Sequence, residues 1–262
     1  TAENKAPDLT IRLWVRDGQI NHKKAPVPLD HVKIVASVLL PKLNADSITI
    51  TGDTINFDLN GKTTRAALFA KGINAPYIRA DLNSEIDLAL LDQAIGLGFA
   101  DFKGQLNLQL KADGYYKKGQ NPKNFRPDTI ITAIPVYALK ASIKNGYYKQ
   151  RDLPLSVEKI NGEIESACKD AQWKNISAAL KNIHAIIGKG AVEGNLQFQR
   201  LAQTELQASL KANLQLEDLA KAIPMAGYSF AGTLSTNLIA NGRLDTDRKI
   251  FPTLTADLQL NN

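Results

Sequence analysis

Apolar and polar residues alternate with a period of two along most of the chain. In LTIRLWV, residues 9–15, the odd positions are apolar, and similar alternation runs through residues 48–59. Successive side chains of a β-strand point to opposite faces of the sheet, so each run predicts a strand. Thr, Asn, Lys and Asp occupy most of the polar positions. The pattern therefore predicts an antiparallel sheet with one apolar face and one solvated face.

Dipeptides that contain glycine separate these runs. They are Asp-Gly at 17–18, Gly-Asp at 52–53, Asn-Gly at 60–61 and Lys-Gly at 71–72. Gly, Asn and Asp tolerate the backbone angles that tight hairpin turns require. We therefore expect the chain to reverse at each of these pairs.

Two segments follow a helical period instead. Residues 87–97 and 215–225 carry apolar side chains three and four positions apart, which is typical of a short amphipathic helix. Asp87 is placed to cap the first helix, and Gly96 and Pro224 are placed to end the two helices.

The chain also repeats itself at an offset of 128 residues. Residues 80–114 align without a gap with residues 208–242, and twelve aligned positions are identical. Chance would give about two identities in a window of this size. The same offset brings residues 7–20 over residues 135–148, so that the turn pair Asp-Gly at 17–18 aligns with Asn-Gly at 145–146. Internal duplication is therefore expected to organise the fold.

We expect two full repeats and the beginning of a third. The first covers residues 1–134 with a basic connector at about 115–134, the second covers 135–251, and 252–262 form the first strand of a truncated third repeat. Each repeat of about 120–130 residues would hold about six strands and one short amphipathic helix. The predicted fold is mostly β, an elongated and curled antiparallel sheet in a fragment of a longer protein. A closed sandwich in each repeat is the alternative.

The amino-acid composition limits the classes of protein to which the chain can belong. The hydrophobic fraction of 44% is sufficient for a globular core, and no apolar run approaches the roughly 20 residues that a membrane-spanning helix needs. The net charge of +6 is dispersed, except in the basic stretch 115–126. That stretch could bind phosphates of nucleic acid or lipid, although a solvated loop is the simpler interpretation.

No catalytic or metal-binding motif is recognisable. LNGKT at 59–63 lacks the first glycine of a phosphate-binding loop, and GKGAVEG at 188–194 lacks dinucleotide-binding spacing. The three histidines, His22, His31 and His184, do not align with one another in the repeat, and Cys168 has no partner thiol. The sequence therefore predicts a protein that is not an enzyme and that has no cofactor and no metal.

A curled sheet would enclose its apolar side in a groove. Aromatic residues make up only 6% of the chain, so Leu, Ile and Ala would form most of the wall, and such a surface suits acyl chains. The candidate groove residues are the apolar positions of the alternating runs: Leu9, Ile11, Leu13, Val15, Ile48, Ile50, Ile55, Phe57, Leu59, Leu106, Leu108, Leu110, Leu139, Ile143, Leu196, Phe198, Leu206, Leu210, Leu234 and Leu238.

The second repeat joins a short helix that ends in proline to a strand with spaced leucines and glycines. The residues of this pattern are Leu216, Asp218, Leu219, Ile223, Pro224, Gly232, Leu234, Leu238 and Gly242. The pattern resembles the repeat unit of the AsmA-like family, the TamB-related envelope proteins of Gram-negative bacteria. The first repeat departs from it by carrying Gly96 in place of the proline.

The resemblance implies a function. Members of this family are anchored in the inner membrane, span the periplasm and conduct phospholipid between the inner and outer membranes, in support of outer-membrane biogenesis. We therefore expect phospholipids or other acyl-chain lipids as partners, both membranes as partners of the parent protein, a periplasmic location, and no nucleic acid. The alternative is a structural or interaction repeat with a self-filled core, such as an outer-membrane-protein assembly factor or an adhesin-like stalk.

Overall fold

The computed structural model describes residues 6–21, 28–95, 99–120, 129–200, 204–222, 231–245 and 248–261. Most of these residues belong to one antiparallel sheet of 13 strands. The sheet is open, and nearly all of its neighbouring strands are also consecutive in the chain. The strands in spatial order are β1 (Leu9–Ile20), β2 (Leu29–Leu40), β3 (Thr49–Leu59), β4 (Lys62–Lys71), β5 (Tyr77–Asp87), β6 (Ala100–Tyr115), β9 (Val136–Gln150), β10 (Val157–Cys168), β11 (Ser177–Ile187), β12 (Gly190–Gln199), β13 (Thr204–Gln215), β14 (Thr233–Leu244) and β15 (Thr253–Asn261).

A few short elements connect these strands. The hairpin β7 (Lys117–Gln120) and β8 (Thr129–Ala133) stands between β6 and β9 and forms a small sheet of its own. Helix α1 (Leu88–Ile95) links β5 to β6, and helix α2 (Leu216–Ala222) links β13 to β14. The described residues also form three short 3-10 helices: η1 (Pro41–Leu43), η2 (Ala45–Ser47) and η3 (Trp173–Asn175).

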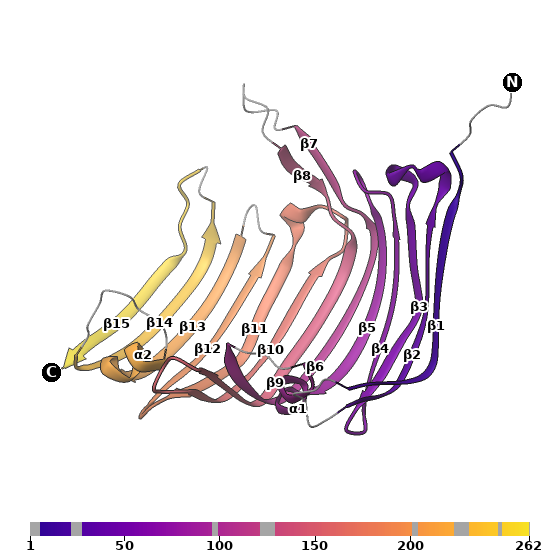
Figure 1. Cartoon of the computed structure of the whole chain (residues 1–262). Helices are drawn as coiled ribbons and strands as arrows, with labels where there is room; N and C mark the ends of the chain where they lie inside the picture. Colours follow the sequence, from indigo (N-terminus) through magenta and orange to yellow (C-terminus); the bar gives the residue numbers. More distant parts are fainter. Residues whose placement is uncertain are drawn as a thin grey trace, which may run out of the picture.

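The connecting elements lie at opposite ends of the strands. Figure 1 shows α1 and α2 at one end, which we call the helix rim, and the β7–β8 hairpin at the other, which we call the hairpin rim. The strands curve between the two rims, so that the sheet forms a trough. Within the described residues no helix is long and apolar enough to cross a membrane.

Three of the expected turns are wrong. The glycine pairs at 17–18 and 52–53 lie inside β1 and β3, and the aligned pair at 145–146 lies inside β9. The pairing register slips at each of these places, between Val15 and Gly18 and between Gly52 and Ile55 for example. An extra residue in one strand bends that strand and increases its twist, and does not reverse the chain. The glycine pairs therefore curve the sheet.

The other two expected turns are present. Asn60 and Gly61 have φ angles of 51° and 77° and reverse the chain between β3 and β4, and Gly72, with φ of 84°, directly follows β4. The basic connector differs from the expected loop, because its described residues form the β7–β8 hairpin. The centre of the basic stretch, residues 121–128, lies outside the described residues.

Both predicted helices are present as α1 and α2. Asp87 caps α1 as expected, because its Oδ1 accepts hydrogen bonds from the backbone N–H groups of Ala89 at 3.0 Å and Leu90 at 3.3 Å. The residues expected to end the helices, Gly96 and Pro224, lie outside the described residues.

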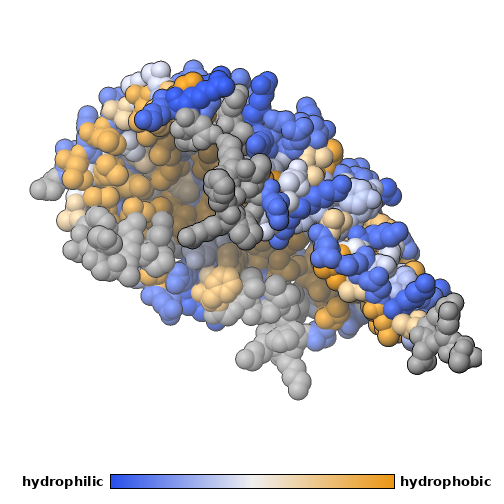
Figure 2. Space-filling model, turned by 90° about the horizontal axis from the view of Figure 1, so that it is seen from above, coloured by the Kyte–Doolittle hydropathy of each residue, from blue (hydrophilic) through white to orange (hydrophobic). Residues whose placement is uncertain are grey.

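The two faces of the sheet differ in burial as well as polarity. In β6 the alternate positions 106, 108, 110 and 112 are half-buried, whereas 109, 111 and 113 are exposed. Side chains on the inner side of a curved sheet crowd together, and those on the outer side diverge. The apolar face is therefore the concave one, and Figure 2 shows hydrophobic residues lining the hollow while hydrophilic residues gather on its outer surface.

Candidate functional site

The apolar face is built from rows of side chains that cross the sheet from strand to strand. Directly paired residues of antiparallel strands project to the same face. One row contributes a residue from each strand between β1 and β13: Val15, Ile34, Ile55, Ala66, Leu82, Leu110, Leu139, Ser166, Ala178, Phe198 and Leu206. The row is apolar except at Ser166.

A second row runs beside the first, nearer the helix rim. It connects β3 to β15 through the following residues: Phe57, Thr64, Ser84, Leu108, Ala141, Ile164, Leu180, Leu196, Ala208, Ala240 and Leu254. The two rows give the trough, which we call the apolar groove, a lining that continues across the sheet.

Hydroxyl groups within the rows satisfy one another. Thr64 Oγ1 and Ser84 Oγ are 2.6 Å apart, and both residues are buried. The Tyr137 hydroxyl lies 2.8 Å from Ser166 Oγ, which donates to the backbone carbonyl of Ser177 at 3.1 Å. A hydroxyl that has a hydrogen-bond partner is much less costly beside apolar surface than one without a partner. These four side chains therefore do not interrupt the groove with an unpaired polar group.

Most candidate groove residues from the sequence meet in these rows or beside them. Leu106 pairs directly with Ile143, Leu210 with Leu238, and Leu234 with Leu214. The remaining candidates of β1 and β3 share the same face: Leu9, Ile11, Leu13 and Ile50.

Two candidates occupy different environments. Ile48 precedes β3, at the end of η2, so it lies at the hairpin rim. Leu59 shares the apolar face but is only 1% exposed, so its side chain belongs to the packing at the helix rim and cannot contact a ligand.

Several residues of the two rows were not among the candidates. Leu82 aligns with the candidate Leu210 at the offset of 128, so the repeat alone could have identified it. Ile164 lies between two glutamates, whereas Leu180 follows an alanine, and the register across β10 and β11 places both in the second row.

The polar face carries ion pairs between neighbouring strands. Lys181 Nζ donates to Glu165 at 2.6 Å and holds the pKa of that carboxyl below its ordinary value. Asp113 accepts hydrogen bonds from the Tyr77 hydroxyl at 2.6 Å and from Arg79 at 2.8 Å, which together lower its pKa. These pairs are exposed to water, so we expect them to contribute little to the stability of the fold. Their main effect is on the distribution of charge over the polar face.

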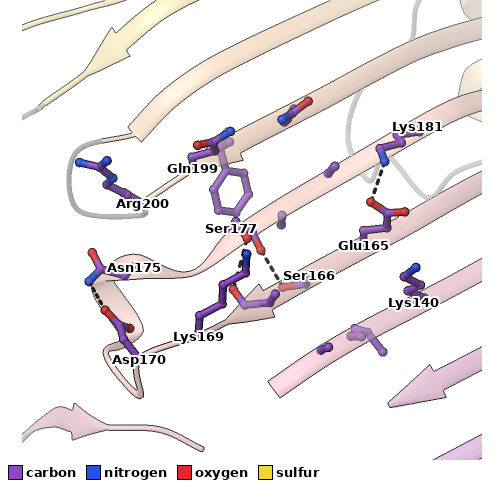
Figure 3. Close-up of a pocket in the computed structure, with 17 residues that line it drawn as sticks. Lys140, Glu165, Ser166, Lys169, Asp170, Asn175, Ser177, Lys181, Gln199 and Arg200 are labelled. Carbon is purple, nitrogen blue, oxygen red and sulfur yellow. Dashed lines mark hydrogen bonds and ion pairs between the residues drawn. The ribbon is translucent and has the colours of Figure 1, made fainter. Parts of the chain in front are cut away.

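A depression of about 870 Å³ lies over β9 to β12. Its lining includes Lys140, Glu165 and Lys181 of the polar face, together with Lys169 and Arg200 from the ends of β10 and β12 (Figure 3). Charged and polar side chains of the polar face therefore line much of this depression.

The serines of this depression, Ser166 and Ser177, donate to backbone carbonyl oxygens. No group of three or more His, Cys, Asp or Glu side chains suited to a metal ion occurs among the residues that the structure describes. We regard the apolar groove, which extends across the sheet, as the candidate functional site.

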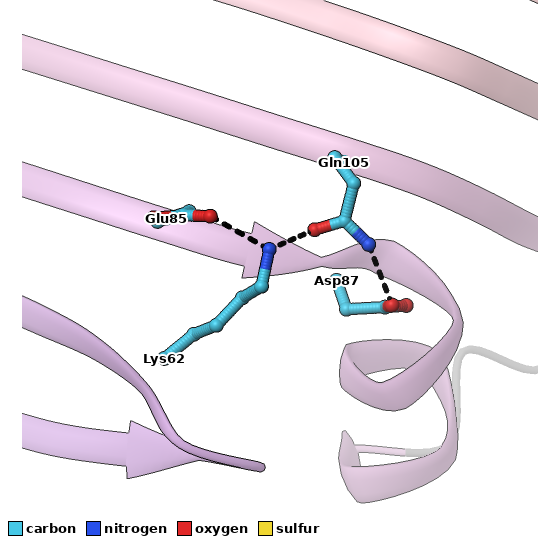
Figure 4. Close-up of polar contacts among 4 residues, drawn as sticks. All are labelled: Lys62, Glu85, Asp87 and Gln105. Atoms are coloured by element: carbon cyan, nitrogen blue, oxygen red, sulfur yellow. Dashed lines mark hydrogen bonds and ion pairs between the residues drawn. The ribbon is translucent and has the colours of Figure 1, made fainter.

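A polar network fixes α1 at the helix rim. Lys62 Nζ donates to Glu85 at 2.7 Å and also to Gln105, whose Nε2 donates to Asp87 at 2.7 Å (Figure 4). Since Asp87 also caps α1, the network joins β4, β5 and β6 to the helix. A rigid connection of this kind keeps α1 beside the end of the groove.

Apolar packing holds α2 in the equivalent place. Leu219 of α2 packs against a small core of Ile187 and Leu214, which are 6% and 7% exposed. Asp218 accepts a hydrogen bond from the backbone N–H of Lys189 at 3.3 Å, in the turn between β11 and β12. Both helices are therefore held in place at the helix rim.

Comparison of the chain with protein-family models, with curated proteins and with solved structures finds no match. The geometry of the groove is therefore the basis on which a function can be proposed.

Proposed function

We propose that the apolar groove binds the acyl chains of phospholipids and conducts them across the sheet, without catalysis. The observation that carries this proposal is the two largely apolar rows, which together extend from β1 to β15 along the trough. Each methylene group that moves from water to such a surface contributes about 0.8 kcal/mol, so a bound tail would be held firmly. A lining of similar residues from strand to strand would offer no deep site at which a lipid is trapped.

The sheet also supports an interpretation as tandem repeats of the AsmA-like kind. Strands β1–β6 and β9–β14 fall in the two aligned halves of the sequence, with one helix before the last strand of each. Gly114 has φ of 140° and lies against Pro135, and the aligned Gly242 has φ of 132° and lies against Pro252. In this proposal the chain is a segment of a periplasm-spanning protein that carries phospholipid from one membrane to the other.

The alternative function, a structural or interaction repeat, requires the apolar face to be filled by the protein itself. Among the described residues only eight apolar side chains are buried, and most of the two rows is only half-buried. Little of the described chain covers the groove, which favours a ligand over a self-filled core.

The test compares neighbouring residues that face opposite ways. A photo-crosslinking residue at Leu108 or Leu238 should capture phospholipid, whereas one at Gln109 or Asn237, the adjacent positions on the polar face, should not. Mass spectrometry of the crosslinked protein and of lipid extracted from the purified chain gives the readout. Equal crosslinking at both faces, or protein that carries no lipid at any groove position, would contradict the proposal.

A further inference from the structure

The outer edge of β1 has no partner strand among the described residues. β1 pairs with β2 on one side, and its side chains Leu9, Ile11 and Leu13 are 44%, 55% and 51% exposed. A free edge presents backbone N–H and C=O groups that can pair with another strand. The edge of β1 is therefore a surface at which a further strand can join the sheet.

The pairing of β9 shows which kind of strand this edge accepts. Residues 7–20 align with residues 135–148, so β9 is the counterpart of β1 in the second repeat. The edge of β9 that corresponds to the free edge of β1 is paired with β6. Leu139 of β9, the counterpart of Ile11, is accordingly half-buried. The free edge of β1 therefore matches a strand of the β6 kind.

The junction between β6 and β9 occurs a second time, between β14 and β15. We call β1, β9 and β15, which align at the start of each repeat, the opening strands, and we call β6 and β14, which align at its end, the closing strands. Leu110 pairs with Leu139 in the first junction, and the aligned Leu238 pairs with Ala256 in the second. The register is the same in both junctions. Applied to β1, this register places Ile11 opposite Leu238 of a β14 strand.

The polar face is compatible with this register. It places Arg12 opposite Asn237, just as Lys140 lies opposite Gln109 in the junction between β6 and β9. Two β1 strands paired with each other would instead bring Arg12 and Arg16 of both copies into one ladder. Like charges that face each other across a ladder are destabilising. The charge pattern therefore favours a closing strand over a second β1 strand.

Within one chain, β15 occupies the edge of β14 that such a pairing needs. β15 is bonded only to β14, all nine of its residues are exposed, and it pairs with residues 233–241 of the twelve-residue β14. β1 is twelve residues long and is already ordered by its pairing with β2. A preordered strand loses less conformational entropy on pairing. Since β15 belongs to the same chain as β14, its replacement by β1 of another copy depends on protein concentration.

We propose that β1 of one copy of this chain pairs with β14 of a second copy, in the register of β6 and β9, and takes the place of β15. Directly paired residues project to the same face, so the apolar groove would continue from one copy into the next. A contact between two different surfaces leaves one of each free at the ends and forms open chains. This inference concerns assembly and does not depend on what the groove binds.

The experiment measures the molar mass of the full chain by sedimentation velocity from micromolar to near-millimolar concentrations. The natural chain should form dimers, trimers and longer species as the concentration rises. The variant Leu254→Asp/Leu258→Asp weakens β15, so its association constant should rise at least about tenfold. The variant Ile11→Asp/Leu13→Asp places charges at the β1 edge, so its association constant should fall at least about tenfold.

Each of these variants is the control for the other, because both replace two exposed apolar residues of an edge strand by aspartate. Nonspecific association through exposed leucines would weaken in both variants, and this outcome would overturn the proposal. Circular dichroism compares the strand content of each variant with that of the natural chain.

Cysteine pairs test the register independently. Ile11→Cys/Leu238→Cys should form a disulfide between copies under mild oxidation, because β1 and β14 lie near opposite ends of the sheet of one copy (Figure 1). Ile11→Cys/Leu234→Cys is displaced by four residues, roughly 13 Å along the strand, and should not form a disulfide. Cys168 is 0% exposed, so it does not compete for oxidation. Gel electrophoresis with and without reductant gives the readout.

Three outcomes would overturn the proposal. The first is a natural chain and a β15 variant that both remain monomeric at every concentration. The second is association that stops at dimers, which would identify pairing between two identical edges. The third is equal disulfide formation by the two cysteine pairs. None of these outcomes bears on lipid binding by the groove, which the crosslinking test of the proposed function addresses separately.

Discussion

At the residue scale, single positions in the strands decide the curvature of the sheet. Gly104 in β6 has φ of 119°, and a Cβ atom at this position would lie 2.7 Å from the Cα atom of Gly146 in β9. The register between the two strands slips at the same place, between Lys103 and Gln105. Two glycines in contact therefore allow a close approach of the backbones where the strands bend.

We predict that Gly104→Ala lowers the free energy of unfolding by about 2–4 kcal/mol, because alanine must adopt a left-handed backbone and also displace the neighbouring strand. Urea denaturation monitored by circular dichroism measures the change. Gly61→Ala is the control. Gly61 has φ of 77°, but a methyl group added there would meet no atom within 4 Å. The free energy of unfolding of this variant should therefore fall by only about 1 kcal/mol. If both variants lost the same free energy of unfolding, the close contact between Gly104 and Gly146 would not contribute to the cost of the Gly104 substitution.

The sequence identified the glycines but not their role. A dipeptide such as Asp-Gly occurs both in hairpin turns and in bulges. Asn60 and Gly61 reverse the chain, whereas Gly18 and Gly146 remain inside long strands. The partner strands decide between the two outcomes, because they either continue the hydrogen-bonded ladder past the glycine or do not.

At the element scale, the two helices could be predicted from the spacing of apolar residues, because the helical period differs clearly from that of the strands around it. The spacing did not predict which surface of the sheet each helix would pack against. Leu219 of α2 contacts a core whose other members come from β11 and β13, and the separation of these strands in the sequence hides the contact.

We expect Leu219→Ala to lower the free energy of unfolding by about 1–3 kcal/mol, since the half-buried leucine loses its contacts with Ile187 and Leu214. Lys221→Ala in the same helix removes an exposed side chain and its ion pair with Asp218 at 3.8 Å, and should cost less than about 0.5 kcal/mol. Chemical denaturation of both variants provides the comparison. A result in which the lysine variant loses as much stability as the leucine variant would contradict the packing of α2 on this core.

At the scale of the whole molecule, a meander of 13 strands has a protected centre and two edges. Strand β9 is bonded on both sides, to β6 and β10, whereas β15 is bonded only to β14 and all nine of its residues are exposed. Strand β1 forms the other edge, with Ile11 55% exposed. Edge strands of this kind open more readily than central strands.

We predict that backbone amides of β9 exchange with deuterium at least about 100-fold more slowly than those of β15, with β1 close to β15. Hydrogen-exchange mass spectrometry makes the measurement at two protein concentrations, so that pairing between edges of different molecules would be detected as concentration-dependent protection. Similar protection of β9 and β15 at low concentration would contradict the sheet order.

The sequence by itself determined that the chain is mostly β, that one face of its strands is apolar and where its two short helices lie. These features follow from the spacing of apolar residues within short segments of the chain. Only the tertiary structure decided that the strands join into one open trough, that glycine pairs bend it, and that the basic connector forms a hairpin on the same rim as Lys169 and Arg200. Register and curvature depend on contacts between residues far apart in the chain, and no local pattern specifies them.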